Sequence, residues 1–516
     1  MTKLLRLNDS AVARWTALVI VSFTMMCGYF ITDVMAPLED LLTKTPAEGG
    51  LGWTSDEYGF FSGAYGYINV FLLMLFFGGI ILDKCGVRFT GVMSSALMFA
   101  GTLLKWYALD NDFGSAQIFG YPMQVALAAL GFAIFGMGAE ITGITVTKVI
   151  AKWFTGHEMA LAMGLQVATA RIGTAAALAC SLPMANAMGE VSAPVLLGAG
   201  LLCVGFLSYL VYCVMDRKLD ASVAAAEEQQ SEENFSFGDL KYILTNKGFW
   251  LIAILCVLFY SGVFPFLKFA TKLMIYKYNV DPELAGLIPA MLPFGTILLT
   301  PVFGSLYDRL GKGATLMIIG SVLLTVVHVL FALPILNAWW FAIIIMVILG
   351  IAFSLVPSAM WPSVPKIIPM KQLGSAYAII FYIQNIGLSM VPVLIGSVIQ
   401  NHSIIETAEG TTYDYTIPMS IFALFGVVSV VIATMLKRID KKEGYNLEEP
   451  NIKKKRLKYI NQKRFNHRVK SLLIYYIPPL IYHTLPPMRI ACAPQGNSQH
   501  RAATPLEHRI SPKTLQ

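Results

Sequence analysis

Charged residues are scarce in this sequence. Only 13% of its 516 residues are Asp, Glu, Lys or Arg, 56% are hydrophobic, and the mean hydropathy is +0.63. Soluble globular domains carry about 25% charged residues, so this composition excludes an ordinary water-soluble protein. It is typical of a protein that crosses a membrane several times.

Motifs for catalysis and metal binding are also missing. The seven cysteines are spread singly, without C-x-x-C or Cys/His spacing, so neither a disulfide framework nor a metal site is expected. The sequence contains no Walker loop, no G-x-S-x-G elbow and no metalloprotease His pair. We therefore predict that the protein is not an enzyme and carries no cofactor.

Long apolar stretches are abundant instead. A helix of about 20 residues crosses a hydrocarbon core of about 30 Å, and backbone groups in lipid must bond within their own segment, so α-helices are expected. The sequence predicts an all-α membrane protein with twelve spans, at 13–38, 58–82, 88–108, 122–150, 159–187, 192–215, 248–277, 284–307, 313–335, 338–361, 372–400 and 416–437. The first span is too long to be a removable signal peptide.

The distribution of basic residues predicts the orientation of the helices, because short cytoplasmic loops are rich in Lys and Arg. Both termini are expected in the cytoplasm, and the opposite connections are acidic. Lys272 and Lys277 are the main exceptions to this pattern. The basic residues on the expected cytoplasmic side are Lys3, Arg6, Arg14, Lys84, Arg88, Lys148, Lys152, Arg309, Lys312, Lys366 and Lys371.

An acidic, polar connection at 216–247 separates six helices from six. We predict a first six-helix bundle at 1–215, a linker at 216–247, a second bundle at 248–437 and a basic tail at 438–516. The tail is expected to contact anionic lipid rather than nucleic acid. A monomer is expected, and the need for an accessory subunit stays open.

The two halves share a short string at equivalent places. "GGIILDKCGVR" contains Asp83 and Arg88, and "GSLYDRLGKG" contains Asp308 and Arg309. Two copies at matching positions indicate a structural repeat rather than a chance basic turn. We predict that these four residues take part in gating.

These strings resemble the signature of the major facilitator superfamily, although Val87 replaces a basic residue that is usual there. The resemblance extends over roughly residues 13–437. It implies two six-helix bundles that rock around a central site by alternating access. It implies transport without naming the solute.

One acid and one base stand at the same depth in neighbouring antiparallel helices. Glu140 lies about 12 residues, or about 18 Å at 1.5 Å per residue, from the expected cytoplasmic end of its helix, and Arg171 lies equally deep in the next one. Because isolated ions are costly in a bilayer, we predict that Arg171 holds Glu140 and that both face a central cavity. A purely structural pair is the alternative.

Such a pair suggests a zwitterionic or anionic solute, with a carboxylate on Arg171 and an amine on Glu140. Polar side chains at similar depth are further candidates for binding, with interhelical hydrogen bonding as the alternative for each. These candidates are Tyr65, Asn69, Tyr382, Gln384 and Asn385.

A gate is predicted at the outer end of the bundle. Pro265 should kink its helix, leaving Lys268 and Lys272 near the outer end at a depth similar to that of Asp33. An ion pair between Asp33 and one lysine would close that end, and snorkelling of the lysines to the interface is the alternative. His328 is expected to be a structural histidine.

Longer stretches resemble the lysosomal dipeptide transporter branch of the superfamily, among them "GMGAEITGITVTKVIAKWFTGHEMALAMGLQVATARIGT" and "MWPSVPKIIPMKQLGSAYAIIFYIQNIGLS". The resemblance implies that Glu140 and Arg171 grip the two ends of a peptide. The N-terminal "TKLLRL" lacks the upstream acid of a lysosomal dileucine signal, so a bacterial cytoplasmic membrane is expected, or a lysosomal membrane in a eukaryote. Uniport and proton coupling both stay open.

Two other functions fit parts of the sequence. "GMGAEITG" is also similar to nitrate and oxalate/formate carriers, although Glu140 would repel a small anion. A membrane receptor that transports nothing is the alternative from another class. We predict a transporter of dipeptides or related amino-acid-derived zwitterions.

Overall fold

Apolar helices make up most of the fold in this computed structural model, which describes residues 7–154, 158–224, 237–335, 337–369, 372–408 and 410–450. These residues belong to one unit, which spans residues 1–452. The tail from residue 451 and linker residues 225–236 lie outside the described residues. So do Lys3, Arg6 and Lys371, three of the residues used to predict the orientation.

The described residues contain eleven helices that are long and apolar enough to cross a membrane. Two of the eleven are interrupted, one between α10 and α11 and one between α12 and α13. The elements of these crossings are α1 (Ala11–Asp33), α5 (Met74–Asp110), α6 (Met123–Phe154), α7 (Met159–Met188), α8 (Ala193–Ala224), α10 (Lys247–Ser261), α11 (Phe264–Tyr278), α12 (Pro282–Ala285), α13 (Leu287–Leu310), α14 (Gly313–Ala332), α15 (Trp339–Ile367), α16 (Leu373–His402) and α17 (Thr416–Glu443).

The expected second span, 58–82, is not one helix. It is divided into α3 (Ser55–Gly63), the 3-10 turn η3 (Ala64–Gly66), α4 (Tyr67–Phe71) and the first turns of α5. The helix α5 then continues past Gly86, whose φ of +74° marks a kink at the expected loop between the second and third spans. The count of eleven long helices therefore differs from the expected twelve because this crossing is broken into short pieces.

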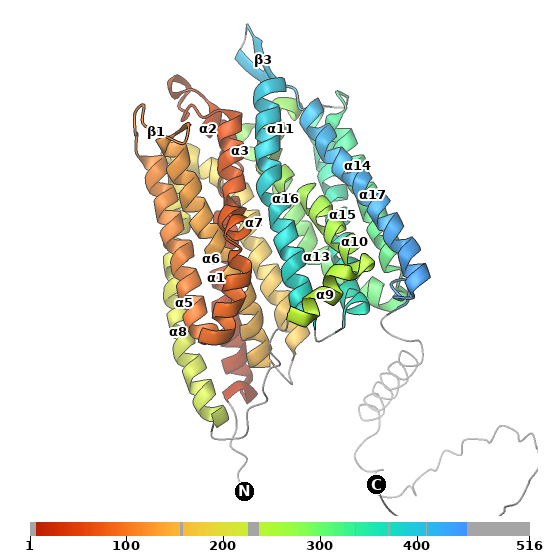
Figure 1. Cartoon of the computed structure of the whole chain (residues 1–516). Helices are drawn as coiled ribbons and strands as arrows, with labels where there is room; N and C mark the ends of the chain where they lie inside the picture. The colour runs from red at the N-terminus through yellow and green to blue at the C-terminus, as the bar shows by residue number, and fades with distance from the viewer. Residues whose placement is uncertain are drawn as a thin grey trace, which may run out of the picture. The chain divides into compact units, whose positions relative to one another are not determined.

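Short elements lie at the ends of the bundle. Two antiparallel hairpins, β1 (Gln117–Ile118) with β2 (Tyr121–Pro122) and β3 (Ile404–Thr407) with β4 (Gly410–Tyr413), stand at one end together with α2 (Glu39–Thr43) (Figure 1). We call this the hairpin end and the opposite end, where η1 (Leu7–Asp9) lies, the terminal end. The other short elements are η2 (Pro46–Glu48) and α9 (Phe237–Thr245).

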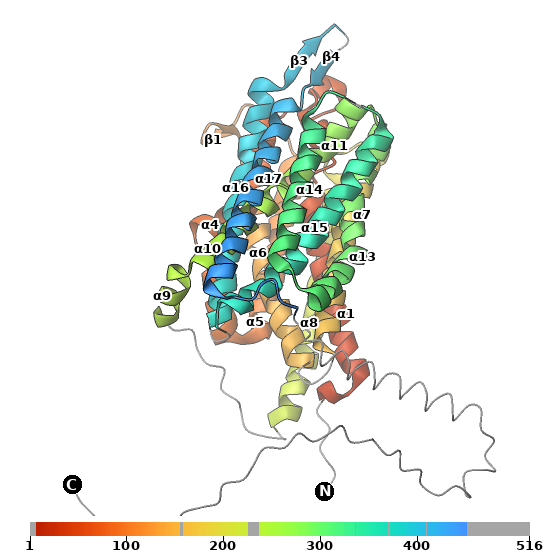
Figure 2. The same ribbon diagram turned by 90° about the vertical axis from the view of Figure 1, so that its right-hand side faces the viewer.

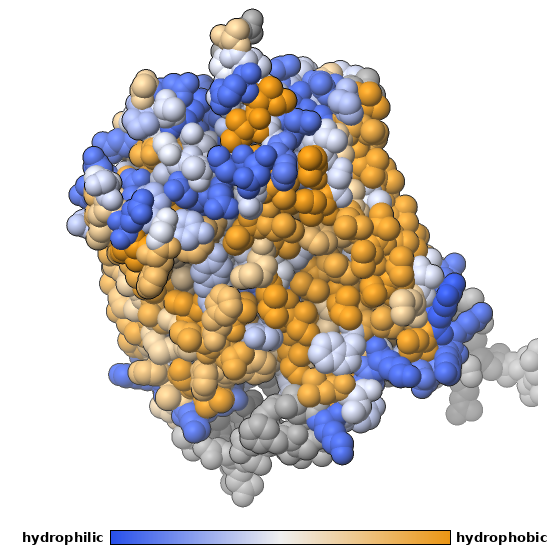
Figure 3. Space-filling model, turned by 45° about the horizontal axis from the view of Figure 1, so that its top comes forward, coloured by the Kyte–Doolittle hydropathy of each residue, from blue (hydrophilic) through white to orange (hydrophobic). Residues whose placement is uncertain are grey.

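The helices form two halves, α1–α8 and α9–α17, which stand side by side in Figure 1; Figure 2 looks onto the second half, with the first half behind it. Within the first half α5 packs on α6 and α1 packs on α7 and α8, while in the second half α14 packs on α15 and α17. The halves meet chiefly where α3 contacts α16 and where α7 contacts α13. Figure 3 shows a broad apolar surface on the flank of the bundle below a hydrophilic hairpin end, as a membrane-embedded protein requires.

Local sequence explains two boundaries. The predicted kink at Pro265 is confirmed, because the helix is interrupted between Ser261, the end of α10, and Phe264, the start of α11. Pro265 stands in the first turn of α11, where a backbone N–H would have no helical partner, so its absence costs no hydrogen bond. The helix α8 continues to Ala224, beyond the expected start of the linker at 216, because Asp216 is buried and ion-paired rather than solvated.

His328 is buried, and its Nε2 lies 2.7 Å from the Gly262 carbonyl oxygen, as expected for a structural histidine.

Candidate functional site

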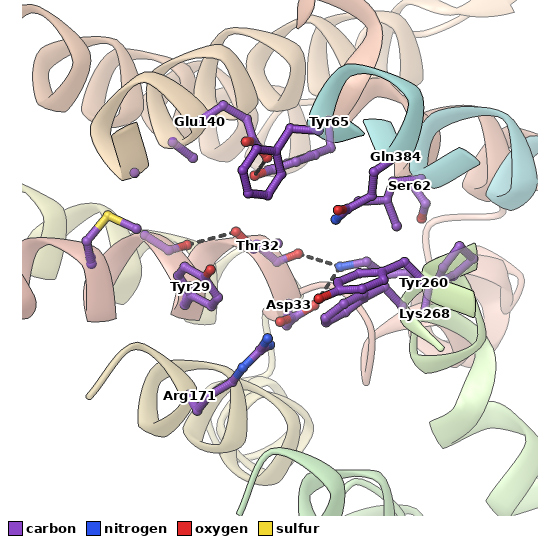
Figure 4. A pocket seen from close by; sticks show the side chains of 18 of the residues that line it. Tyr29, Thr32, Asp33, Ser62, Tyr65, Glu140, Arg171, Tyr260, Lys268 and Gln384 are labelled. Atoms are coloured by element: carbon purple, nitrogen blue, oxygen red, sulfur yellow. Dashed lines mark hydrogen bonds and ion pairs between the residues drawn. The ribbon is translucent and has the colours of Figure 1, made fainter. Parts of the chain in front are cut away.

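A cavity of about 370 Å³ lies between the two halves. This volume is within the range of sites that enclose small molecules. Helices of both halves line it, and its walls combine apolar side chains with a few polar ones (Figure 4). The polar and charged lining residues include Tyr29, Thr32, Asp33, Ser62, Tyr65, Glu140, Arg171, Tyr260, Lys268 and Gln384.

Glu140 lines this cavity from α6. Its Oε1 accepts a 2.9 Å hydrogen bond from the hydroxyl of Tyr65, which η3 supplies. Gly136, one turn earlier on α6, makes this contact possible, because a Cβ there would lie 2.8 Å from the carbonyl carbon of Tyr65. The glycine in "FGMGAE" therefore lets the backbone of η3 approach α6 and brings the phenol to the carboxylate.

Arg171 lines the cavity from α7 and is surrounded by aromatic rings. Its guanidinium carbon lies 5.6 Å from the ring centre of Tyr29, 5.2 Å from that of Phe264 and 5.5 Å from that of Phe353. These distances are typical of cation–π contacts. Across the part of the chain that the structure describes, Arg171 forms no ion pair, so its charge is held by rings that leave N–H groups free to donate.

The predicted ion pair between Glu140 and Arg171 is therefore wrong. The two side chains stand on opposite sides of the cavity (Figure 4). The physical reason is that each has another partner: the carboxylate accepts from Tyr65, and the guanidinium contacts the three rings. Equal depth placed both residues in one cavity but did not bring them into contact.

The other predicted binding residues divide into two groups. Tyr65 and Gln384 line the cavity, and the Gln384 Oε1 accepts from the Cys256 thiol at 3.4 Å. The remaining three are absent from its lining and bond to backbone carbonyls: Asn69 to Gly136 at 3.3 Å, Asn385 to Phe381 at 3.0 Å and Tyr382 to Val70 at 3.2 Å. Asn385 also hydrogen-bonds to the carboxylate of Glu140. Asn69 and Tyr382 therefore fit the alternative, interhelical hydrogen bonding. Successive side chains on a helix point about 100° apart, so residues at the depth of the cavity need not face it.

Asp33 and Lys268 form an ion pair between the halves at the hairpin-end wall of the cavity. The Lys268 Nζ lies 2.7 Å from the Asp33 Oδ1 and donates to the Thr32 carbonyl at 2.6 Å. Both side chains are largely buried, at 13% and 5% exposure. The predicted pairing of Asp33 with one of the two lysines is thus present in the structure.

Lys272 contacts the first half one turn further toward the hairpin end. Its Nζ donates to the Thr43 hydroxyl at 2.7 Å, lies 4.0 Å from the ring centre of Tyr413 and is 3.9 Å from the Glu39 carboxylate. Neither oxygen of Glu39 has a hydrogen-bond partner among the residues that the structure describes. Burial raises the pKa of Glu39 to about 8, and Lys272 opposes that rise. Nothing in the sequence indicates this site, because Glu39 follows the first apolar stretch, in an acidic connection that is expected to face water.

The repeated strings lie at the terminal end. Asp83 accepts from Lys148 at 2.8 Å, and Arg88 contacts Asp216 at 3.2 Å and Asp220 at 2.6 Å. The pairing of Arg88 with Asp216 and Asp220 could not be predicted, because both aspartates fall within the expected linker, 216–247. In the second string Asp308 is half-buried and Arg309 is exposed in the last turn of α13.

Aromatic residues of the second half were also missed. The Trp361 Nε1 donates to the Tyr260 hydroxyl at 3.0 Å, and Phe381 stacks on Trp361 with ring centres 4.9 Å apart. All three line the cavity. The aromatic string "FYSGVFPF", which contains Pro265, is a signal that could have indicated Tyr260, whereas Trp361 and Phe381 stand in "MWPSVP" and "AIIFYIQN".

Comparisons with known proteins agree with this architecture. The family described as Major Facilitator Superfamily matches residues 18–392 and 266–482. The chain is 26% identical over 408 residues to the lysosomal dipeptide transporter MFSD1 of Bos taurus, covering 76% of this chain and 80% of that protein. It is 26% identical over 402 residues to the Homo sapiens protein of the same name, covering 75% and 80%.

Solved structures with the same fold include two transporters. The nucleoside transporter NupG superposes with a TM-score of 0.58 at 16% identity, covering 82% of this chain and 98% of NupG. A POT family transporter in complex with 5-aminolevulinic acid superposes with a TM-score of 0.60 at 14% identity, covering 83% and 96%. At these identities the likeness shows the fold alone.

Proposed function

The chain belongs to the Major Facilitator Superfamily and is a multi-pass membrane transporter, and we propose that it moves dipeptides or related amino-acid-derived zwitterions by alternating access. One observation carries this proposal: Glu140 and Arg171 present opposite charges to one cavity without neutralising each other. The relatives named as dipeptide transporters support the same class of solute.

In this proposal Glu140 binds the amino group of the solute and Arg171 binds its carboxylate. A charged hydrogen bond to each end fixes the length and direction of the solute. The rings around Arg171 cover its faces and favour bidentate donation from the edge of the guanidinium. A dipeptide, whose ends are about 7 Å apart when extended, can bridge two walls that do not touch.

The charge balance of the lining supports a zwitterion over a simple anion. Two acids, Asp33 and Glu140, face two bases, Arg171 and Lys268. A zwitterion with no net charge leaves the net charge of the cavity unchanged and can contact both the acidic and the basic side chains. A small anion would gain from Arg171 but would be repelled by Glu140 in a site of low dielectric constant.

The contacts between the halves support a state closed at the hairpin end. Within the described ranges, most hydrogen bonds and ion pairs between the halves involve residues near that end, and two lie near mid-depth. Near the hairpin end they are Ser55 with Gln400, Tyr58 with Lys268, Lys268 with Thr32 and Asp33, Lys272 with Thr43 and Glu39, and Tyr276 with Asp40; near mid-depth they are Tyr382 with Val70 and Glu140 with Asn385. With both termini in the cytoplasm, this state faces inward.

Gating follows from these contacts. To open the hairpin end, Lys268 and Lys272 must leave the first half, which breaks the pair with Asp33. Asp83, Arg88, Asp308 and Arg309 lie at the terminal end, and in this proposal the opposite closure forms among them. Each half then moves as a packed body while these small sets of contacts exchange.

Two further parts of the proposal are the energy source for transport and the membrane in which the protein lies. Glu140 forms no ion pair with a basic residue among those described, so it is available to carry a proton when the solute leaves. Proton coupling and uniport are therefore distinguished by an imposed pH gradient. The relatives carry a lysosomal name, which favours the lysosomal membrane over the bacterial one.

Uptake of a labelled dipeptide panel into proteoliposomes tests the proposal. Glu140→Gln and Arg171→Lys should each abolish uptake by folded protein, because each removes one of the two charged contacts. Arg217→Lys and Glu443→Gln, at exposed positions on α8 and α17, are the matched controls and should transport normally. Failure of folded wild-type protein to take up any dipeptide, together with uptake of formate or nitrate, would overturn the proposal.

A further inference from the structure

A second lysine stands behind the gate, outside the cavity. Lys105 of α5 is completely buried, and its Nζ donates to the carbonyl of Ile31 at 3.3 Å. The rings of Phe132 and Phe135 lie 4.7 Å and 5.7 Å from the ammonium group. Among the described residues Lys105 forms no ion pair, so a buried amino group is held only by a carbonyl and two rings. Such a group calls for an explanation, because ions within a bilayer are costly and mark function.

The position of Lys105 relative to the end of α1 supplies that explanation. The helix ends at Asp33, so its last carbonyls need donors from elsewhere. Lys105 donates to Ile31 and Lys268 donates to Thr32, so two lysines hold adjacent carbonyls of the same helix end. Cations are favoured there by the helix dipole. Lys105 is also close enough to interact electrostatically with Asp33 and Lys268.

The two lysines differ in the half to which they belong. Lys268 lies on α11 in the second half, whereas Lys105 lies on α5 in the same half as Asp33. When the hairpin end opens, Lys268 moves away with its half and Lys105 stays. The backbone of α5 at Lys105 is fixed against α6, because a Cβ on Gly131 would lie 2.6 Å from the Lys105 backbone nitrogen.

We propose that Lys105 is a positioning residue of the gate: it becomes the counter-ion of Asp33 when Lys268 departs, so that the carboxylate has a cation in both states of the transport cycle. The proposal rests on the gating role of the pair between Asp33 and Lys268. It explains why a lysine is kept in the core of the first half, where its charge has no acid of its own. Without Lys105, opening of the hairpin end would leave the buried carboxylate of Asp33 without a cationic partner.

The test measures opening of the hairpin end without using a solute. Ser62, which lines the cavity from α3, is replaced by Cys, and its reaction with a membrane-impermeant thiol reagent is followed from the hairpin-end side of sealed vesicles. Protein without this added cysteine gives the background from native thiols. Because no dipeptide is present, the readout is valid even if dipeptide transport fails, which separates this inference from the proposed function.

Lys105→Met should lower the labelling rate about tenfold, because the open state then contains an unpaired buried carboxylate. Asp33→Asn removes the closing ion pair and should by itself raise labelling, so the effect of Lys105→Met is measured again in that background. With no carboxylate at position 33, adding Lys105→Met should leave the labelling rate of Asp33→Asn unchanged. A purely structural lysine would slow labelling about tenfold in this background as well, and that result would overturn the proposal. Lys105→Arg keeps the positive charge, so folded protein with this substitution should be labelled at the wild-type rate.

Lys277→Met is the matched control. Lys277 also donates to carbonyls at the end of a helix, those of Phe331 and Leu333 after α14, but all three residues belong to the second half. Loss of this cap should leave labelling of Ser62→Cys unchanged. Equal slowing by Lys277→Met and Lys105→Met would show a general loss of packing and would also overturn the proposal.

Discussion

The hydroxyl of Tyr65 donates a 2.9 Å hydrogen bond to Oε1 of Glu140 across the wall of the central cavity. This contact sets the direction of the one carboxylate that α6 presents to the cavity. Asn385 of α16 also hydrogen-bonds to this carboxylate. The geometry therefore assigns Tyr65 to orienting Glu140 and leaves recognition to the carboxylate itself.

Tyr65→Phe should weaken solute binding without abolishing transport. Hydrogen bonds to charged groups contribute about 1.5–3 kcal/mol, and water in the cavity replaces part of this, so we expect an increase in KM of about fivefold with a smaller change in kcat. Tyr67→Phe is the control, because the Tyr67 hydroxyl donates to the Phe60 carbonyl and does not line the cavity. Uptake kinetics with an unchanged KM for Tyr65→Phe would contradict this role.

Closure of the hairpin end depends on a contact between two glycines. A Cβ on Gly59 of α3 would lie 2.6 Å from the Pro392 carbonyl and 2.9 Å from the Gly396 Cα of α16. Backbone atoms cannot yield at these distances, so Gly59→Ala should separate α3 from α16 and disfavour the closed state. We expect labelling of Ser62→Cys from the hairpin-end side to rise about fivefold, since about 1 kcal/mol of strain gives a change of that order.

Gly200→Ala on α8 is the matched substitution, because no atom lies within 4 Å of its added Cβ. It should leave labelling and uptake unchanged. If Gly59→Ala also had no effect on labelling, the contact between α3 and α16 would not limit opening.

The terminal end of the first half depends on a buried aspartate. Asp216 is 1% exposed and contacts Arg88 at 3.2 Å, Lys152 at 2.8 Å and the Tyr212 hydroxyl at 3.1 Å. Asp216→Asn should lower the free energy of unfolding by about 2 kcal/mol, less than for a fully buried network because Arg88 and Lys152 reach solvent. Thermal unfolding in detergent measures this loss. Asp220→Asn, with a side chain 45% exposed, should cost less than about 1 kcal/mol.

Depth along a helix was the part of the site that the sequence could predict. Counting residues from the helix ends placed Glu140 and Arg171 in one cavity and placed Asp33 near Lys268, because rise per residue is fixed. The partners of those residues could not be predicted. They depend on the η3 turn that carries Tyr65, whose irregular backbone has no period in the sequence.

The burial of two charged side chains, Lys105 and Glu39, could not be predicted from the sequence either, because it depends on tertiary packing. Lys105 and Glu39 stand near the ends of apolar stretches, where a charge normally reaches water. Only the packing of other elements, α6 over Lys105 and α11 over Glu39, removes them from solvent. The division of the second span likewise follows from tertiary contacts at Gly63 and Gly66 with α16 rather than from hydropathy.

Glu39 and its surroundings form a titratable contact between the halves. The carboxylate of α2 lies 3.9 Å from Lys272 of α11, and Tyr58, Tyr415 and Asp40 also interact with it electrostatically. Lys272 is the one base of this set and favours the charged form of Glu39. Burial dominates, so the pKa of Glu39 is raised from 4.5 to about 8 in the closed state.

Closure of the hairpin end should therefore be favoured by acid. Opening returns Glu39 to water and to its ordinary pKa, so between pH 4.5 and about 8 the closed state binds more protons than the open one. The stabilisation of the closed state is complete below pH 4.5 and is lost as the pH rises through about 8. Labelling of Ser62→Cys from the hairpin-end side, taken relative to the same cysteine in Glu39→Gln at each pH to cancel thiol ionisation, should rise by about two orders of magnitude from pH 5 to pH 8. A constant ratio would mean that Glu39 keeps one protonation state throughout the cycle.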